Sequence, residues 1–141
     1  MLKRVIACDF VPEGKDVGLL ALRLVAGTSL LLKHGLEKVF HFSAMAAHFP
    51  DPLHIGAVPT LVIAMISDFV CSILMVLGLA TRWAAAWSFV NILAAWAFIH
   101  HFEFLGRGAD HGELIVLYLA ALMTLVLAGG GKYSVDGLLR R

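Results

Sequence analysis

Charged residues are scarce in this chain: Asp, Glu, Lys and Arg make up 15% of its 141 residues, against roughly 25% in soluble domains. Hydrophobic residues make up 60%, and the mean hydropathy is +0.88. A lipid environment favours this composition, so we expect one membrane-embedded domain. The formal net charge is +1, and no basic patch is interleaved with aromatic residues. Nucleic acid is therefore not an expected partner.

Cysteine is also rare, and the two present, Cys8 and Cys71, form no CxxC pair. This excludes thioredoxin-like redox chemistry and a cysteine zinc site. No Walker loop, GxGxxG, HExxH or GxSxG pattern occurs, so catalysis with a soluble cofactor has no support. The N-terminus has a basic start but only a short apolar piece before Asp9, which is a poor signal peptide. We expect residues 1–16 to be retained as a cytoplasmic segment.

Long apolar runs are the main feature of the sequence. The second run, from Ala57 to Leu79, holds 23 residues with one charge, Asp68, near its middle. A helix of that length spans roughly 34 Å, enough to cross the ~30 Å hydrocarbon core of a bilayer. The sequence therefore predicts an all-α fold, an antiparallel four-helix transmembrane bundle within residues 17–131, followed by a cytoplasmic tail at 132–141. The predicted spans are 17–34, 57–79, 83–99 and 113–128.

Residues 35–49 keep a helical pattern but become amphipathic. This stretch predicts either an extension of the first helix or a helix lying in the membrane interface. Pro50-Asp51-Pro52 ends it, because proline breaks helices.

The distribution of Lys and Arg predicts the orientation of the four spans. The side that carries both termini has seven, against three on the other side, so the positive-inside rule places both termini in the cytoplasm. The seven are Lys3, Arg4, Lys15, Arg82, Lys132, Arg140 and Arg141, and the three are Lys33, Lys38 and Arg107.

Asp68 needs a partner, because an ionisable group at mid-depth costs at least about 2.5 kcal/mol on insertion scales. Arg23 is the single charge in the first apolar run, and we predict that it pairs with Asp68. The alternative for Arg23 is snorkelling to the nearer headgroups. With Asn91 of the third span, these residues predict an internal polar site. It could be a lock that fixes helix packing, or it could be a proton-accepting or quinol-binding site.

All seven histidines fall on the outer side of this topology. Imidazoles with carboxylates suit a metal or a proton-coupled quinone reaction. The heptad-spaced His34, His41 and His48 would lie about 10 Å apart, too far to share an ion. His100 or His101 with His111 could converge, yet we expect no stoichiometric metal. Glu113 opens the last helix, where a carboxylate favours the helix dipole. The outer-side candidates are His34, Lys38, His100, His111 and Glu113.

Several short motifs occur in an order that resembles the DoxX family. The first helix carries Asp16-Val17-Gly18, Arg23-Leu24, Gly27, Gly35 and Lys38. The second apolar run resembles the family's second helix at Asp68-Phe69 and the exit of that helix at Leu77–Arg82. Glu113 matches the acid that often opens the family's last helix. The closing segment of the family matches at Gly129–Asp136. The family usually has Glu in place of Asp68.

This resemblance implies a bacterial inner-membrane four-helix protein, with relatives among the small subunits of thiosulfate:quinone oxidoreductases and in oxidative-stress complexes. The function expected from it is a membrane subunit of a redox system that handles a quinone or a thiol/sulfur reductant. The alternatives are a non-catalytic membrane scaffold or assembly partner and, less favoured, a small permease. Expected partners are the lipid bilayer, redox subunits and further copies of this chain. A quinone is the cofactor to consider.

Overall fold

Within residues 14–104 and 112–140, which this computed structural model describes, all regular structure is helical. The all-α prediction is therefore confirmed. Four long helical rods carry the fold, and two shorter helices lie at its ends. Rod 1 consists of α2 (Lys15–Leu30), η1 (Leu31–Gly35) and α3 (Leu36–Phe40), and rod 2 consists of α5 (Ala57–Met65), η2 (Ile66–Cys71) and α6 (Ser72–Leu77). Rod 3 is α7 (Thr81–Phe98), and rod 4 is α8 (Gly112–Ala128). The short helices are α4 (Phe42–Ala46) and α9 (Val135–Leu139).

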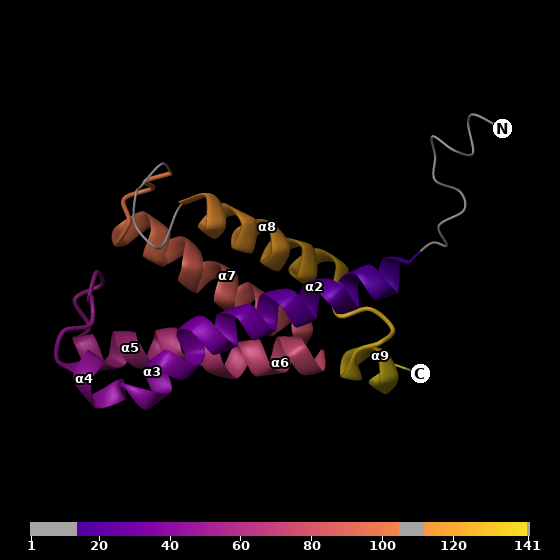
Figure 1. Cartoon of the computed structure of the whole chain (residues 1–141), viewed down its shortest axis with the longest axis horizontal. Coiled ribbons are helices and arrows are strands. Elements are labelled where there is room, and N and C mark those ends of the chain that lie inside the picture. Colours follow the sequence, from indigo (N-terminus) through magenta and orange to yellow (C-terminus); the bar gives the residue numbers. More distant parts are fainter. Residues whose placement is uncertain (1–13, 105–111, 141) are drawn as a thin grey trace.

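The rods alternate in direction and form two antiparallel hairpins, rod 1 with rod 2 and rod 3 with rod 4 (Figure 1). The start of α2 and the end of α8 lie at the same end of the molecule, which we call the terminal end. There the backbone N–H of Lys132 donates to Asp16 Oδ1 at 2.8 Å. The opposite end, the loop end, carries α4 and the segments 47–56 and 99–104.

The two hairpins touch in the terminal half and separate toward the loop end. α2 packs on α8, and α7 packs on α6 and η2. Nearer the loop end, η1 stays against η2 and α7 stays against α8, whereas Figure 1 shows α7 and α8 rising away from α3 and α5. The molecule is thus a wedge that opens at its loop end.

Helices lie over all four predicted apolar ranges, but the first is longer than expected. The amphipathic stretch after residue 34 continues rod 1 as far as Phe40, which is one of the two alternatives considered. The backbone then turns at His41, where φ is −112° and ψ is 23°, into α4.

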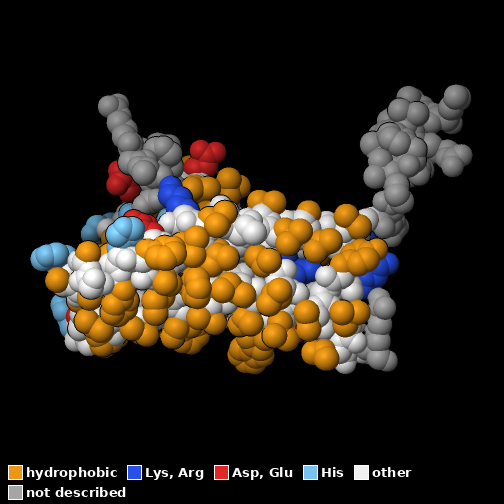
Figure 2. All heavy atoms as spheres, turned by 60° about the horizontal axis from the view of Figure 1, so that its bottom comes forward, with side chains coloured by type: hydrophobic (Ala, Val, Ile, Leu, Met, Phe, Trp, Pro, Cys, Tyr) orange, Lys and Arg blue, Asp and Glu red, His pale blue; other side chains and the backbone are white. Residues whose placement is uncertain are grey.

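The surface between the two ends is apolar. In the view of Figure 2, hydrophobic side chains cover the middle of the molecule, and histidines and acidic side chains gather at the loop end. Two helices of the described chain, Lys15–Phe40 and Ala57–Leu77, are long and apolar enough to cross a membrane. α8 is also apolar but has 17 residues.

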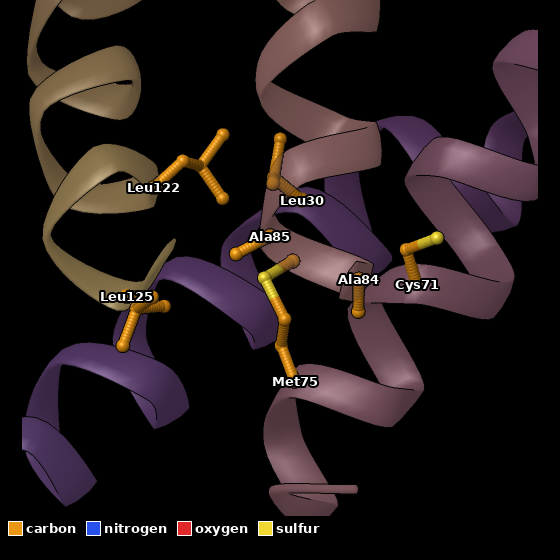
Figure 3. Packing of buried hydrophobic residues seen from close by; sticks show 7 residues of the cluster. All are labelled: Leu30, Cys71, Met75, Ala84, Ala85, Leu122 and Leu125. Atoms are coloured by element: carbon orange, nitrogen blue, oxygen red, sulfur yellow. The ribbon is translucent and has the colours of Figure 1, made fainter. Parts of the chain in front are cut away.

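The closest packing lies in the terminal half, where all four rods contribute to one apolar core (Figure 3). Gly27 lets rod 1 approach rod 2, because a Cβ there would lie 2.8 Å from the Val76 side chain. Small residues on α7, Ala84 and Ala85, are buried in the same core. The core residues are Leu30, Cys71, Met75, Ala84, Ala85, Leu122 and Leu125.

Candidate functional site

A buried ion pair joins the two rods of the first hairpin. Lys38 Nζ lies 2.8 Å from Asp68 Oδ2, and the two residues are 8% and 6% exposed. The hydroxyl of Ser67 donates to Asp68 Oδ1 at 2.9 Å, and Lys38 Nζ also donates to the His34 carbonyl at 3.4 Å. Both charges are therefore compensated, which a buried ion pair requires if it is to be retained.

Two π-helical turns bring this pair together. η1 and η2 pack against each other, and a Cβ on Gly35 would lie 2.3 Å from the Asp68 carbonyl oxygen. Only glycine allows so close an approach of the two backbones. Lys38 follows Gly35 by about one turn, and helical side chains point back toward the N-terminus, so its ammonium reaches Asp68. Such π-helical turns inside α-helices occur frequently at functional sites.

The pair lines a cavity of about 780 Å³ between the two separated hairpins. The cavity extends from the loop end, at Pro50 and Ile99, to Asp68 in the middle of rod 2. Its walls are mostly aliphatic and aromatic, and its volume lies in the usual range for small-molecule sites. The polar and titratable side chains among its lining residues are His34, Lys38, Thr60, Asp68, Asn91, His100 and Tyr118.

The predicted pairing of Arg23 with Asp68 is wrong. The Arg23 guanidinium donates to the carbonyls of Met75 at 3.1 Å, Val76 at 3.0 Å and Tyr133 at 2.9 Å. Met75 is seven residues beyond Asp68, which is about 10 Å along a helix. The first turns of α2 extend past the end of α6 (Figure 1), so Arg23 meets the end of rod 2, and its side chain does not reach the middle of that rod. Arg23 is 1% exposed and does not snorkel to the surface.

The other predicted site residues fall into three groups. Asn91, His34 and His100 line the cavity together with Asp68 and Lys38. Glu113 is exposed at the start of α8 and is not among the lining residues. His111 lies outside the described residues. Within the described chain no group of three or more His, Cys, Asp or Glu side chains could hold a metal ion.

Two cavity residues went unnoticed in the sequence. Tyr118 lies between apolar residues of α8, and its hydroxyl lies 2.6 Å from Ser29 Oγ on rod 1. Thr60 follows Pro59 in the first turn of rod 2, and its hydroxyl donates to Asp51 Oδ1 at 3.0 Å. A polar side chain inside an apolar run is the signal that could have identified both.

The DoxX family model matches residues 18–101, which is more than half of the chain. The chain belongs to the DoxX family. Two proteins of Haemophilus influenzae, both described as uncharacterized, are similar over most of their length. One is 28% identical over 95% of this chain and 91% of its own length, and the other is 33% identical over 82% and 85%. No solved structure matches the chain.

Three motifs of the DoxX resemblance meet at the terminal end. Arg23 ties α2 to the end of α6 and to Tyr133 in the closing segment. Gly78 ends rod 2 with φ +74°, and a Cβ there would lie 2.5 Å from an Arg23 nitrogen. Asp136 accepts from the backbone N–H groups of Ala80 at 2.7 Å and Thr81 at 2.8 Å, which caps α7. In this DoxX protein these residues therefore hold helices together, and the cavity is built elsewhere.

Hydrogen bonding also sets the titration of Asp136. Partial burial alone would raise the pKa of its carboxyl. The hydrogen bonds from Thr81 and Ala80 and the positive charge of Arg140 outweigh it and hold the pKa below the ordinary 3.8. The carboxylate is therefore the form present at neutral pH.

Proposed function

We propose that this DoxX-family membrane protein is a four-helix subunit of the bacterial inner membrane that binds a quinone in the cavity beside Lys38 and Asp68. Its electrons would come from a thiol or sulfur reductant through redox partner subunits. The observation that carries the proposal is the apolar cavity of about 780 Å³ that ends on a buried ion pair.

The chemistry of the pair suits a quinone head group. The Lys38 ammonium can donate a hydrogen bond to a quinone carbonyl, and the Asp68 carboxylate can accept one from a quinol hydroxyl. Reduction of a quinone takes up two electrons and two protons, and oxidation releases them. A buried lysine beside a carboxylate, together with His34 and His100 in the cavity wall, provides groups that can exchange those protons.

The apolar surface supports the membrane placement. Large hydrophobic side chains are exposed on every rod, among them Val25, Val70, Val90 and Leu117. Such an extensive apolar surface is costly in water and favourable in lipid. With the Lys and Arg excess at the terminal end, the arrangement favours rods that span the bilayer with both termini in the cytoplasm.

The competing function is a non-catalytic scaffold, in which polar residues only specify packing. The Arg23 cluster fits that description, because the guanidinium donates its hydrogen bonds to backbone carbonyls of this chain. The Lys38–Asp68 pair differs, because it forms part of the wall of a large cavity. A scaffold has no need of such a space, since empty volume costs stability.

The test is quinone binding by the purified protein in nanodiscs. Trp83 and Trp87 line the cavity, so a bound quinone should quench their fluorescence. We expect saturable quenching by a short-chain benzoquinone, weakened about tenfold or more by Asp68→Asn, because a hydrogen bond to a charged group contributes about 1.5–3 kcal/mol. Glu113→Gln is the matched control: the same acid-to-amide change, at an exposed acid away from the cavity. Absence of saturable quenching in the wild type would reject the quinone site in favour of the scaffold.

A further inference from the structure

We propose that the ligand enters this cavity sideways from the bilayer, through a slit between rod 2 and α7, and that its isoprenoid chain stays in that slit. We call the side slit the part of the cavity lined by Thr60 and Ile63 of α5 and by Ala86, Trp87 and Val90 of α7. The inference rests on the proposed quinone site, since it concerns how a quinone reaches that site.

One face of α7 carries the slit. The residues that line the cavity recur every three or four positions from Trp83 to Ile99, so one face of the helix forms this wall of the cavity along its whole length. That face is about 24 Å long at 1.5 Å per residue, a length that several isoprene units can follow. Trp87 and Val90 line the cavity and are still 48% and 64% exposed. The cavity is therefore open along this side and not only at the loop end.

On the opposite side of the wedge, α2 and α8 pack against each other. Between α2 and α8, the hydroxyls of Ser29 and Tyr118 lie 2.6 Å apart and bridge the two helices. Tyr118 and Leu114 line both the main cavity and a shallow groove of about 220 Å³ on the outside of α2 and α8. They lie between the two spaces, so within the described residues the α2–α8 side is bridged and the side slit is a lateral opening.

The chemistry of the slit selects an apolar chain. Its side chains are aliphatic or aromatic apart from the Thr60 hydroxyl, which is already bonded to Asp51 and to the Gly56 carbonyl at 2.9 Å. The charged groups of the cavity, Lys38 and Asp68, lie at its inner wall. A molecule with a polar, neutral head and one long apolar tail fits both parts at once. Among the described lining residues, Lys38 and Asp68 are the Lys, Arg, Asp or Glu side chains, and they neutralise each other, which disfavours a charged lipid head group.

The experiment compares two tryptophan substitutions on opposite sides of the wedge. Val90→Trp places an indole in the slit, and Val25→Trp places one on the α2–α8 side. The two valines are similarly exposed, at 64% and 68%. The protein is reconstituted in nanodiscs with either a water-soluble short-chain benzoquinone or a long-chain isoprenoid quinone. The bound quinone is extracted and quantified by mass spectrometry.

We expect Val90→Trp to lower the affinity for the long-chain quinone at least about tenfold, because each methylene that loses its burial weakens binding by a factor of several. Binding of the short-chain quinone should be unchanged, and Val25→Trp should leave both unchanged. Equal affinities of wild type and Val90→Trp for the long-chain quinone would overturn the slit, as would equal losses in the two variants. In those cases short-chain binding still supports the quinone site. Wild-type protein that binds neither quinone would overturn both proposals.

Discussion

At the scale of single residues, the buried charges of this protein do two different things. Arg23 meets only backbone carbonyls and joins three segments of the terminal end. Lys38 and Asp68 meet each other across the two rods of the first hairpin, at the wall of the cavity. The first arrangement fixes packing, and the second also presents charge to a ligand-sized space.

The ion pair should show strong coupling in a double-mutant cycle. Removing one partner strands a buried charge and costs about 3–5 kcal/mol, whereas replacing both by apolar residues can be nearly neutral. We therefore expect Lys38→Met and Asp68→Leu each to lower the melting temperature in detergent, and the double variant to recover most of the loss. The control cycle pairs Asp68→Leu with Arg23→Met and should give additive losses. Additive losses for Lys38 and Asp68, with coupling below about 0.5 kcal/mol, would be inconsistent with the pair.

Asp136 should make part of the stability depend on acid. Its pKa is lowered in the folded protein, so the folded state binds its proton less readily than the unfolded state does. The stabilisation is therefore fully present above the ordinary pKa of 3.8 and is lost as the pH falls below it, through the lower folded pKa. Melting temperatures between pH 6 and pH 3 should fall less steeply in Asp136→Asn than in wild type. An identical slope would show that the cap at Ala80 and Thr81 is not linked to this proton.

At the scale of elements, the two facing π-helical turns determine where the site forms. Apolar runs and the proline-rich break were enough to predict the four helices, since length and composition dominate helix formation in lipid. They could not show η1 and η2, because no residue pattern marks the extra residue of a π-helical turn. The apolar runs also could not show that α2 extends beyond α6. For that reason the sequence placed Arg23 too near Asp68. A cavity depends on the angle between the hairpins, which no local pattern contains.

Gly35→Ala tests the contact between the two turns. A Cβ at this position would lie 2.3 Å from the Asp68 carbonyl oxygen, so η1 and η2 must move apart. We expect a loss of about 1–3 kcal/mol, the usual cost of overpacking, together with weaker quinone binding. Gly18→Ala is the control, because a Cβ there meets nothing within 4 Å. It should be neutral or stabilise by up to about 1 kcal/mol, as alanine favours helices. Equal stabilities of the two variants would contradict the close contact.

At the scale of the whole molecule, the wedge places its two kinds of polar cluster at opposite ends. The terminal end is tied together by Arg23 and Asp136, and the loop end is open and rich in histidine. The proposed orientation puts the tied end in the cytoplasm and the open end outside. Fusion of alkaline phosphatase to the C-terminus should therefore give an inactive reporter, and fusion of a fluorescent protein a fluorescent one. Strong phosphatase activity from the C-terminal fusion would reverse the orientation.

The central claim is that a quinone head group lies beside Lys38 and Asp68, and photoaffinity labelling tests it most directly. A quinone that carries an azide on its ring is irradiated with the protein in nanodiscs, and the labelled peptides are identified by mass spectrometry. The account predicts adducts on the lining residues of η2, η1 and the central part of α7, around Asp68, His34 and Asn91, which an excess of unlabelled quinone abolishes. Adducts confined to lipid-exposed positions such as Val25 and Leu127, and unaffected by competitor, would contradict it.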